Sequence, residues 1–247
     1  MMTKDELADA YQRSRADLTA YLARMVVRHD IAEELAQEAA LRLIAKDPRL
    51  DDVAAVRPWL FRVASRLAID HLRAHSTWRE DVLTAVRHRA DGNPAFQAES
   101  LALVSSPEMA MIAREHLGIC LSCTLRNLPA QHAAALLLTE VHDFTLLEAA
   151  RILEATPAQV KNWLQAARAR MRALYDASCA LVGKQGVCYQ CVELSEFFNH
   201  RREDPLDGTP GDLDARFAVV RSMRTVGMGR WHVLMTTMLN DMLNLDH

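Results

Sequence analysis

Apolar side chains recur every three or four positions along several stretches of this chain, which is the period of an α-helix with one buried face. The pattern predicts helices over 5–28 and 31–45, and Pro48 marks the end of the second. Another helix is predicted to start near Pro58, because proline is tolerated in a first helical turn. The apolar face of the second helix is expected to contain Ile31, Leu35, Ala39 and Leu43. We expect these helices to form one small domain over 5–75.

Clusters of Gly, Pro, Asn and Ser divide the rest of the chain. They predict a linker over 76–107 with short helical pieces, followed by a second helical domain over 108–178. A third segment, 183–247, is expected to be a mainly helical C-terminal extension. Its two predicted helices lie near 212–225 and 229–244. The expected fold class is therefore all-α, with two small helical domains, a linker and an extension.

Composition and charge refine this picture. Hydrophobic residues make up 50% of the chain and aromatic residues only 6%, as in many helical proteins. Neither a run of about 18 apolar residues nor a signal-peptide core occurs, so we expect a cytoplasmic protein without a membrane partner. The net charge of −3 hides an acidic block over 30–52 and basic blocks over 57–79 and 155–175. Such alternation suits a protein that meets a basic partner at one place and phosphate at others.

Two capping boxes outline a helix-turn-helix. Thr145 and Glu148 form the first box, and Thr156 and Gln159 form the second. Pro157 occupies the first position of the second helix, which proline favours. Two capped helices separated by about three residues are typical of a helix-turn-helix.

The second of these helices has one apolar face and one face of hydrogen-bond donors when it is drawn at 100° per residue. The donor face consists of Lys161, Asn162, Gln165, Arg168 and Arg172. Asn and Gln can read adenine, and Arg and Lys can read guanine or hold phosphate. An ordinary surface helix usually mixes charges of both signs, whereas this face contains no carboxylate. The pattern favours DNA contact over an ordinary amphipathic surface helix.

Several stretches of the chain resemble a known family. The stretch LRNLPAQH at 125–132, followed by LLLTEVHDFTLLEAARILEATPAQVKNWLQAARARMRAL, resembles region 4 of sigma-70-type factors of the extracytoplasmic-function group. The earlier stretches DIAEELAQEAALRLI and RPWLFRVASRLAIDHLR resemble region 2 of the same group. The resemblance implies an alternative RNA polymerase sigma factor that directs promoter-specific initiation and is not an enzyme.

The resemblance also implies partners. Region 4 of the family reads the −35 promoter element with its second helix, and region 2 binds the β′ clamp helices and reads the −10 element. The implied partners are therefore the polymerase core, through its β′ clamp helices and β flap, and promoter DNA. An anti-sigma factor is a further candidate partner.

The residues of the region 2 stretch fit these roles. An acidic helix surface suits an Arg-rich partner, and its members are Glu33, Glu34, Gln37 and Glu38. Aromatic faces with cationic neighbours can hold unstacked bases. The candidates for DNA contact are Trp59, Phe61, Arg62, Arg66 and Arg73. Core packing is an equal alternative for Trp59 and Phe61.

Five cysteines include two CxxC pairs, Cys120 with Cys123 and Cys188 with Cys191. Four thiolates could hold zinc in tetrahedral geometry, or another thiolate-bound metal or an iron–sulfur cluster. A reversible disulfide is another possibility, and Cys120 and Cys123 as buried small hydrophobes are a third. We expect the extension to regulate activity in cis, with a passive stabilising cap as the alternative.

Two other classes of function remain open. A stand-alone helix-turn-helix regulator would use 145–174 alone and would leave the region 2 helices without a role. A thiol–disulfide enzyme would use a CxxC pair, but that motif usually follows a strand in a βαβ setting. No strand of that kind is predicted here, so enzymatic activity is not expected.

Overall fold

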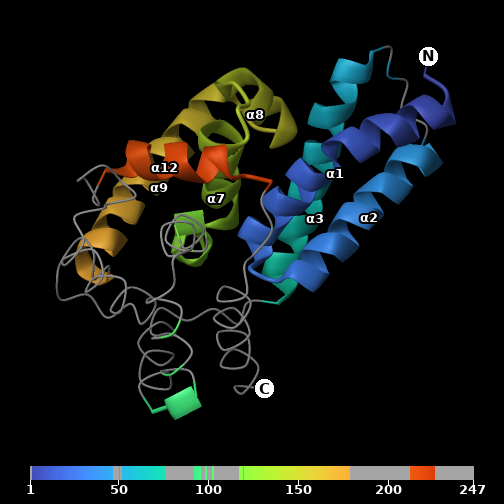
Figure 1. Ribbon diagram of the computed structural model, residues 1–247. Helices are drawn as coiled ribbons and strands as arrows, with labels where there is room; N and C mark the ends of the chain where they lie inside the picture. Colours follow the sequence, from blue (N-terminus) through green and yellow to red (C-terminus); the bar gives the residue numbers. More distant parts are fainter. Residues whose placement is uncertain are drawn as a thin grey trace. The chain divides into compact units, whose positions relative to one another are not determined.

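A computed structural model of the protein describes residues 2–46, 50, 52–75, 92–95, 98, 102, 117–118, 120–178 and 212–225. Every regular element within these ranges is a helix (Figure 1), which confirms the all-α fold class. The chain divides into two compact units. The first comprises Met1–Ser76, Leu128–Ala167 and Arg224–Val226, and the second comprises Thr77–Asn127, Arg168–Met223 and Gly227–His247. Residues of both sigma-like regions therefore share the first unit.

Helix α1 runs over Lys4–Val26 and begins with a capping box. The Thr3 hydroxyl accepts a hydrogen bond from the Glu6 amide at 3.3 Å, and the Glu6 carboxylate accepts one from the Thr3 amide at 2.7 Å. Val27 ends the helix in the left-handed conformation, with φ of 57°. The predicted helix over 5–28 therefore differs from α1 by one or two residues at each end.

Helix α2 spans His29–Lys46 and packs against α1, but its buried face differs from the prediction. The buried residues are Ala32, Ala36, Ala39 and Leu43. Ile31 and Leu35 are only half-buried. The small alanines allow neighbouring helix axes to approach closely, whereas larger side chains at those positions would hold them apart. The predicted face was therefore wrong at two of its four positions.

A 3₁₀ turn, η1 (Val53–Ala55), leads into α3 (Val56–Ala74), whose first turn contains Pro58 as predicted. Helices α1, α2 and α3 pack together (Figure 1). The buried positions on α3 are Val56, Leu60, Phe61, Ala64, Ser65 and Ala68. The hydroxyl groups of Tyr21 and Ser65 lie 2.7 Å apart and form a buried hydrogen bond, so neither is left unsatisfied in this core.

The first unit also contains α7 (Ala130–Leu136), the π-helical segment η2 (Leu137–Val141) and α8 (Leu146–Ile152). Helix α3 packs against both α7 and α8. In the π segment, the His142 amide donates to the Leu137 carbonyl at 3.0 Å, one residue further back than in an α-helix. This wider turn places His142 in the interior, where its side chain is fully buried.

In the second unit, residues 120–125 are helical, and α12 (Leu213–Ser222) begins at the N-cap Asp212. The Asp212 carboxylate accepts hydrogen bonds from the amides of Asp214 and Ala215. Helix α12 falls within the predicted 212–225. The predicted helix over 229–244, almost all of the predicted linker, and the pair Cys188 and Cys191 lie outside the described residues. No described helix has the length and apolar character needed to cross a membrane.

Candidate nucleic-acid and polymerase surfaces

Helices α8 and α9 (Pro157–Ser178) form the predicted helix-turn-helix. The Thr145 hydroxyl accepts from the Glu148 amide at 3.3 Å, and the Glu148 carboxylate accepts from the Thr145 amide at 2.8 Å. Thr156 and Gln159 repeat the arrangement at 3.2 and 2.8 Å. Both predicted capping boxes are confirmed. They satisfy the amides that each helix start would otherwise leave without acceptors.

The two faces of α9 differ sharply in exposure. Val160, Ala167 and Met171 are fully buried on the inner face. The exposed residues of the predicted donor face are Lys161, Asn162, Gln165 and Arg172. The exposed donors recur with the spacing of one helix face, so a single groove of duplex DNA can meet them together.

Arg168, the fifth predicted donor, has a partner within its own unit. Its Nη1 donates to the Asp214 carboxylate of α12 at 2.8 Å, and its guanidinium lies 5.4 Å from the centre of the Phe217 ring. The Arg168 side chain is 23% exposed, while that of Asp214 is 70% exposed. Asp214, a residue of the C-terminal extension, therefore binds the arginine that the sequence pattern assigned to DNA contact.

Trp163 also has a defined neighbour. Its ring stacks on that of His132 with 6.1 Å between ring centroids and 28° between planes. Burial lowers the pKa of His132, so the imidazole is neutral at pH 7 and stacks as an uncharged ring. The stack ties α9 to the helix α7 that carries His132.

The acidic surface on α2 has the predicted exposure. Glu33, Glu34 and Gln37 are exposed, and Glu38 is half-buried and pairs with Arg42 at 2.7 Å. Leu41, which the sequence analysis did not select, is 62% exposed on the same helix. The sequence could have indicated this residue, because Leu41 lies seven positions after Glu34 and so lies on the same face of the helix. An apolar side chain beside carboxylates is a suitable contact for a protein partner.

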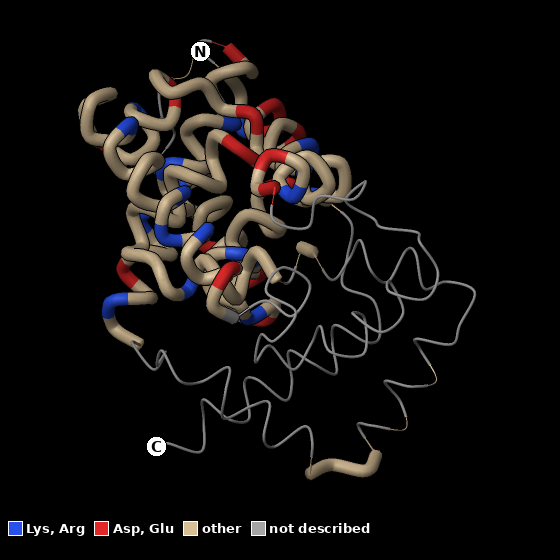
Figure 2. Tube along the Cα trace, turned by 90° about the vertical axis from the view of Figure 1, so that its left-hand side faces the viewer, with Lys and Arg blue, Asp and Glu red and all other residues tan. Residues whose placement is uncertain are grey.

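Figure 2 shows Lys and Arg interspersed with Asp and Glu over the described trace. On α3, Arg62, Arg66 and Arg73 are all exposed, and Arg73 lies 3.7 Å from Asp70. Their exposure is compatible with phosphate contact, which stays a prediction.

The two aromatic candidates of α3 differ. Trp59 is half-buried, whereas Phe61 has no exposed surface. The Phe61 ring lies 5.2 Å from that of Tyr21 and 4.9 Å from that of Phe144, measured between centroids. The core-packing alternative therefore describes Phe61 in this structure, and only Trp59 keeps a surface that could meet a base.

Cys120 and Cys123 are both buried and form no disulfide. Nη1 of the buried Arg216 lies 3.9 Å from the Cys120 sulfur, and its guanidinium lies 4.2 Å from the Tyr175 ring centre. No group of three metal-ligand side chains occurs among the described residues. A four-thiolate site would need Cys188 and Cys191, which the structure does not describe, so it stays a prediction.

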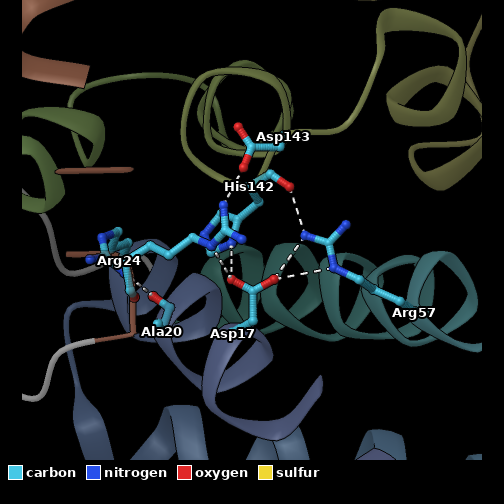
Figure 3. A network of polar contacts seen from close by, with 7 residues as sticks. Asp17, Ala20, Arg24, Arg57, His142 and Asp143 are labelled. Atoms are coloured by element: carbon cyan, nitrogen blue, oxygen red, sulfur yellow. Dashed lines mark hydrogen bonds and ion pairs between the residues drawn. The ribbon is translucent and has the colours of Figure 1, made fainter. Parts of the chain in front are cut away.

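A charged network that the sequence analysis missed surrounds Asp17 of α1 (Figure 3). Arg57 donates to one oxygen of this carboxylate from Nη2 at 2.8 Å, and His142 Nδ1 lies 2.9 Å from the other. Arg57 Nη2 also donates to the His142 carbonyl at 2.6 Å. Sequence separation hides this cluster, because Asp17 and His142 lie 125 residues apart and neither belongs to a short motif.

The groups around Asp17 and His142 determine the charge state of each side chain. Burial alone would raise the pKa of the Asp17 carboxyl, but hydrogen bonds from His142 and Arg57 and the positive charge of Arg57 hold it at about 2. Burial lowers the pKa of His142, against the opposing effect of Asp17. We therefore assign an ionised Asp17 that accepts from a neutral His142 at pH 7, since a neutral imidazole can still donate from Nδ1.

Comparisons with known proteins assign both regions to one family. Residues 10–77 match the family model described as Sigma-70 region 2, and residues 119–171 match Sigma-70, region 4. The chain is 29% identical to "ECF RNA polymerase sigma factor SigM" of Bacillus subtilis over 178 residues, covering 71% of this chain and 96% of SigM. This chain is a sigma factor of the extracytoplasmic-function group.

Two further relatives are similar to this sigma factor. "RNA polymerase sigma factor SigZ" of Bacillus subtilis is 22% identical, over 70% of this chain and 89% of SigZ. "Probable ECF RNA polymerase sigma factor SigI" of Mycobacterium tuberculosis is 38% identical, over 32% of this chain and 27% of SigI. In this sigma factor the region 4 match ends at residue 171, so the C-terminal extension lies beyond both family models.

Proposed function

We propose that this sigma factor brings RNA polymerase core to promoters whose −35 element is bound by α9, and that its C-terminal extension restrains this binding in cis. The main support is the face of α9 formed by Lys161, Asn162, Gln165 and Arg172, which is exposed and carries no carboxylate. A helix with that face can enter the major groove and combine base contacts with phosphate contacts.

In this proposal, region 2 supplies the polymerase and −10 contacts. An acidic surface that would complement an Arg-rich helix pair is formed by Glu33, Glu34 and Gln37. The exposed Leu41 adds apolar area beside it. On α3, exposed Arg62 and Arg66 would track the phosphates of the melted strand. The same helix offers Trp59 for stacking.

The proposed restraint acts through Asp214. Its carboxylate meets the Arg168 guanidinium as a DNA phosphate oxygen would, because both are anionic oxygen acceptors for the same donors. Phe217 lies beneath the guanidinium and adds a cation–π contact. Promoter DNA would have to displace Asp214 before Arg168 could contact phosphate.

In vitro transcription with purified polymerase core tests the proposed function. The protein is expected to direct initiation from a cognate promoter, and the double variant K161A/Q165A to bind its −35 duplex about 30-fold to 100-fold more weakly, because two groove contacts are removed. Binding of the duplex is measured by fluorescence anisotropy. K4A/Q12A removes the same side-chain types from exposed positions of α1 and is expected to change neither result.

The same experiments discriminate between a sigma factor and a stand-alone helix-turn-helix regulator. A stand-alone regulator would bind its duplex equally well without core and would direct no initiation from any template. Absence of core association by the intact protein would contradict the proposal.

The variant D214N is expected to raise the affinity of the free protein for −35 DNA about twofold to fivefold, because it removes a largely exposed competitor of phosphate at Arg168. Asp176 is an exposed carboxylate later on α9, so D176N makes the same charge change away from Arg168. Anisotropy titrations of both variants separate the two effects. Equal gains from both would show that general electrostatics, rather than the Asp214 contact, sets the affinity.

A further inference from the structure

Residues of region 2 and region 4 share one core in the first unit. The Phe61 ring from α3 lies 4.9 Å from the ring of Phe144 and 5.5 Å from that of His142. The Tyr21 ring of α1 meets the His142 ring edge-on at 5.5 Å. Arg57 lies 4.0 Å above the Phe144 ring. These contacts bury aromatic surface that either region alone would expose to water, so they favour association of the two regions.

Polar groups complete the contact. Asp17 of region 2 accepts from His142 of region 4, and Arg57 links Asp17 to the His142 carbonyl. Each of these partners satisfies a charge or polar atom that would be costly to bury alone. The network is therefore specific to the state in which the two regions touch.

One member of the network comes from the C-terminal extension. The guanidinium of Arg224 pairs with Asp17 of α1, from Nε at 3.2 Å, and also with Asp143 of region 4. The Arg224 carbonyl accepts from Arg24 Nη1 at 3.0 Å, which fixes the backbone there as well. A single side chain thus joins a carboxylate of one sigma region to a carboxylate of the other.

This contact conflicts with simultaneous binding of two promoter elements, a conclusion that rests on the proposed function. Elements centred near −35 and −10 are separated by about 25 base pairs, or roughly 85 Å at 3.4 Å per pair. The reach of one arginine side chain joins Asp17 to Asp143 in this structure. The two regions must therefore separate before both elements are occupied.

We propose that Arg224 is a clasp that holds regions 2 and 4 together in a closed state of the free sigma factor by bridging Asp17 and Asp143. The extension then stabilises the closed state, and binding of the polymerase core selects the open one. Because the Arg224 side chain is 32% exposed and Asp143 is 50% exposed, the ion pair is accessible enough to break without unfolding either region.

Energy transfer between fluorophores at the exposed positions 9 and 151 measures the closed population, since position 9 lies on α1 and position 151 on α8. The labels are introduced as non-natural side chains, so the cysteines stay intact. R224Q is expected to raise the ratio of open to closed molecules roughly threefold to tenfold. R13Q removes an exposed arginine from α1 and is expected to leave the ratio unchanged.

A second variant tests the other end of the clasp. Asp143 has φ of 59°, a conformation that Asn tolerates, so D143N removes the charge and keeps the backbone. D143N is expected to open the chain in the same direction as R224Q, and the double variant to open it little further than R224Q alone, because R224Q already breaks the ion pair with Asp143. Additive effects of the two single variants would overturn the clasp.

Other outcomes also decide the proposal. An unchanged transfer distribution in R224Q, or equal opening by R13Q, would overturn it. The measurement uses the full chain without polymerase or DNA, so its failure leaves the proposed function standing. Conversely, a protein that closes through Arg224 but never binds core would refute the proposed function and keep the clasp.

Discussion

The variant F61A is expected to lower the free energy of unfolding by about 3–5 kcal/mol, measured by urea denaturation. The Phe61 ring has no exposed surface and lies against the rings of Tyr21, His142 and Phe144, so truncation would leave a cavity among three aromatic groups. Such a cavity costs the lost transfer free energy and also the lost packing contacts. Phe61 is therefore expected to act mainly through the fold.

Trp59 provides the matched control, because it lies on the same helix and is only half-buried. W59A is expected to cost about 1 kcal/mol of stability but to weaken binding of single-stranded −10 DNA by roughly 5-fold to 100-fold, which corresponds to loss of one base stack. If F61A were as stable as the parent protein and lost strand binding instead, the assignment of the two aromatic residues would be reversed.

The variant D17N is expected to destabilise the first unit by about 3 kcal/mol, because it leaves the guanidinium groups of Arg57 and Arg224 beside a neutral amide. The Asp17 side chain is 13% exposed, so water compensates little of this loss. Thermal unfolding measures the change. D9N, an exposed carboxylate two turns earlier on α1, makes the same substitution without that network and is expected to change stability by less than about 0.5 kcal/mol.

The pH dependence of stability gives the same network a second signature. His142 has a lowered pKa in the fold, so the unfolded chain binds its proton more readily and stability is expected to fall as pH drops from 7 to 5. Asp17 has a pKa of about 2 against an ordinary 3.8, so its contribution is present above pH 4 and is lost as pH falls toward 2. D17N is expected to lack the second decline. A parent protein as stable at pH 5 as at pH 7 would contradict the assignment of a neutral buried His142.

Local signals in the sequence predicted the helices well. The capping boxes at Thr145 and Thr156 fixed both starts of the helix-turn-helix, because the atoms that satisfy each cap lie within three residues. The buried faces of the helices were harder to predict. On α2 the closely packed positions are alanines, so a search for large apolar residues selected Ile31 and Leu35 at the margin of the contact.

Long-range contacts could not be predicted from a single sequence. Arg168 looked like any other donor of α9, and only the folded chain places Asp214, 46 residues later, against it. His142 was not selected from the sequence, because nothing in the neighbouring residues indicates that a π-helical turn directs its ring inward. Contacts of this kind depend on tertiary packing rather than on local periodicity.

The left-handed backbone at Asp143 limits how this position can change during evolution. Apart from aspartate, asparagine and glycine are the residues that adopt such a conformation most readily, and neither carries a negative charge. An aspartate codon becomes an asparagine or a glycine codon through one nucleotide substitution. A lineage could therefore relax the proposed clasp of its sigma factor in a single genetic step, at little cost to the fold, and recover it by reversion.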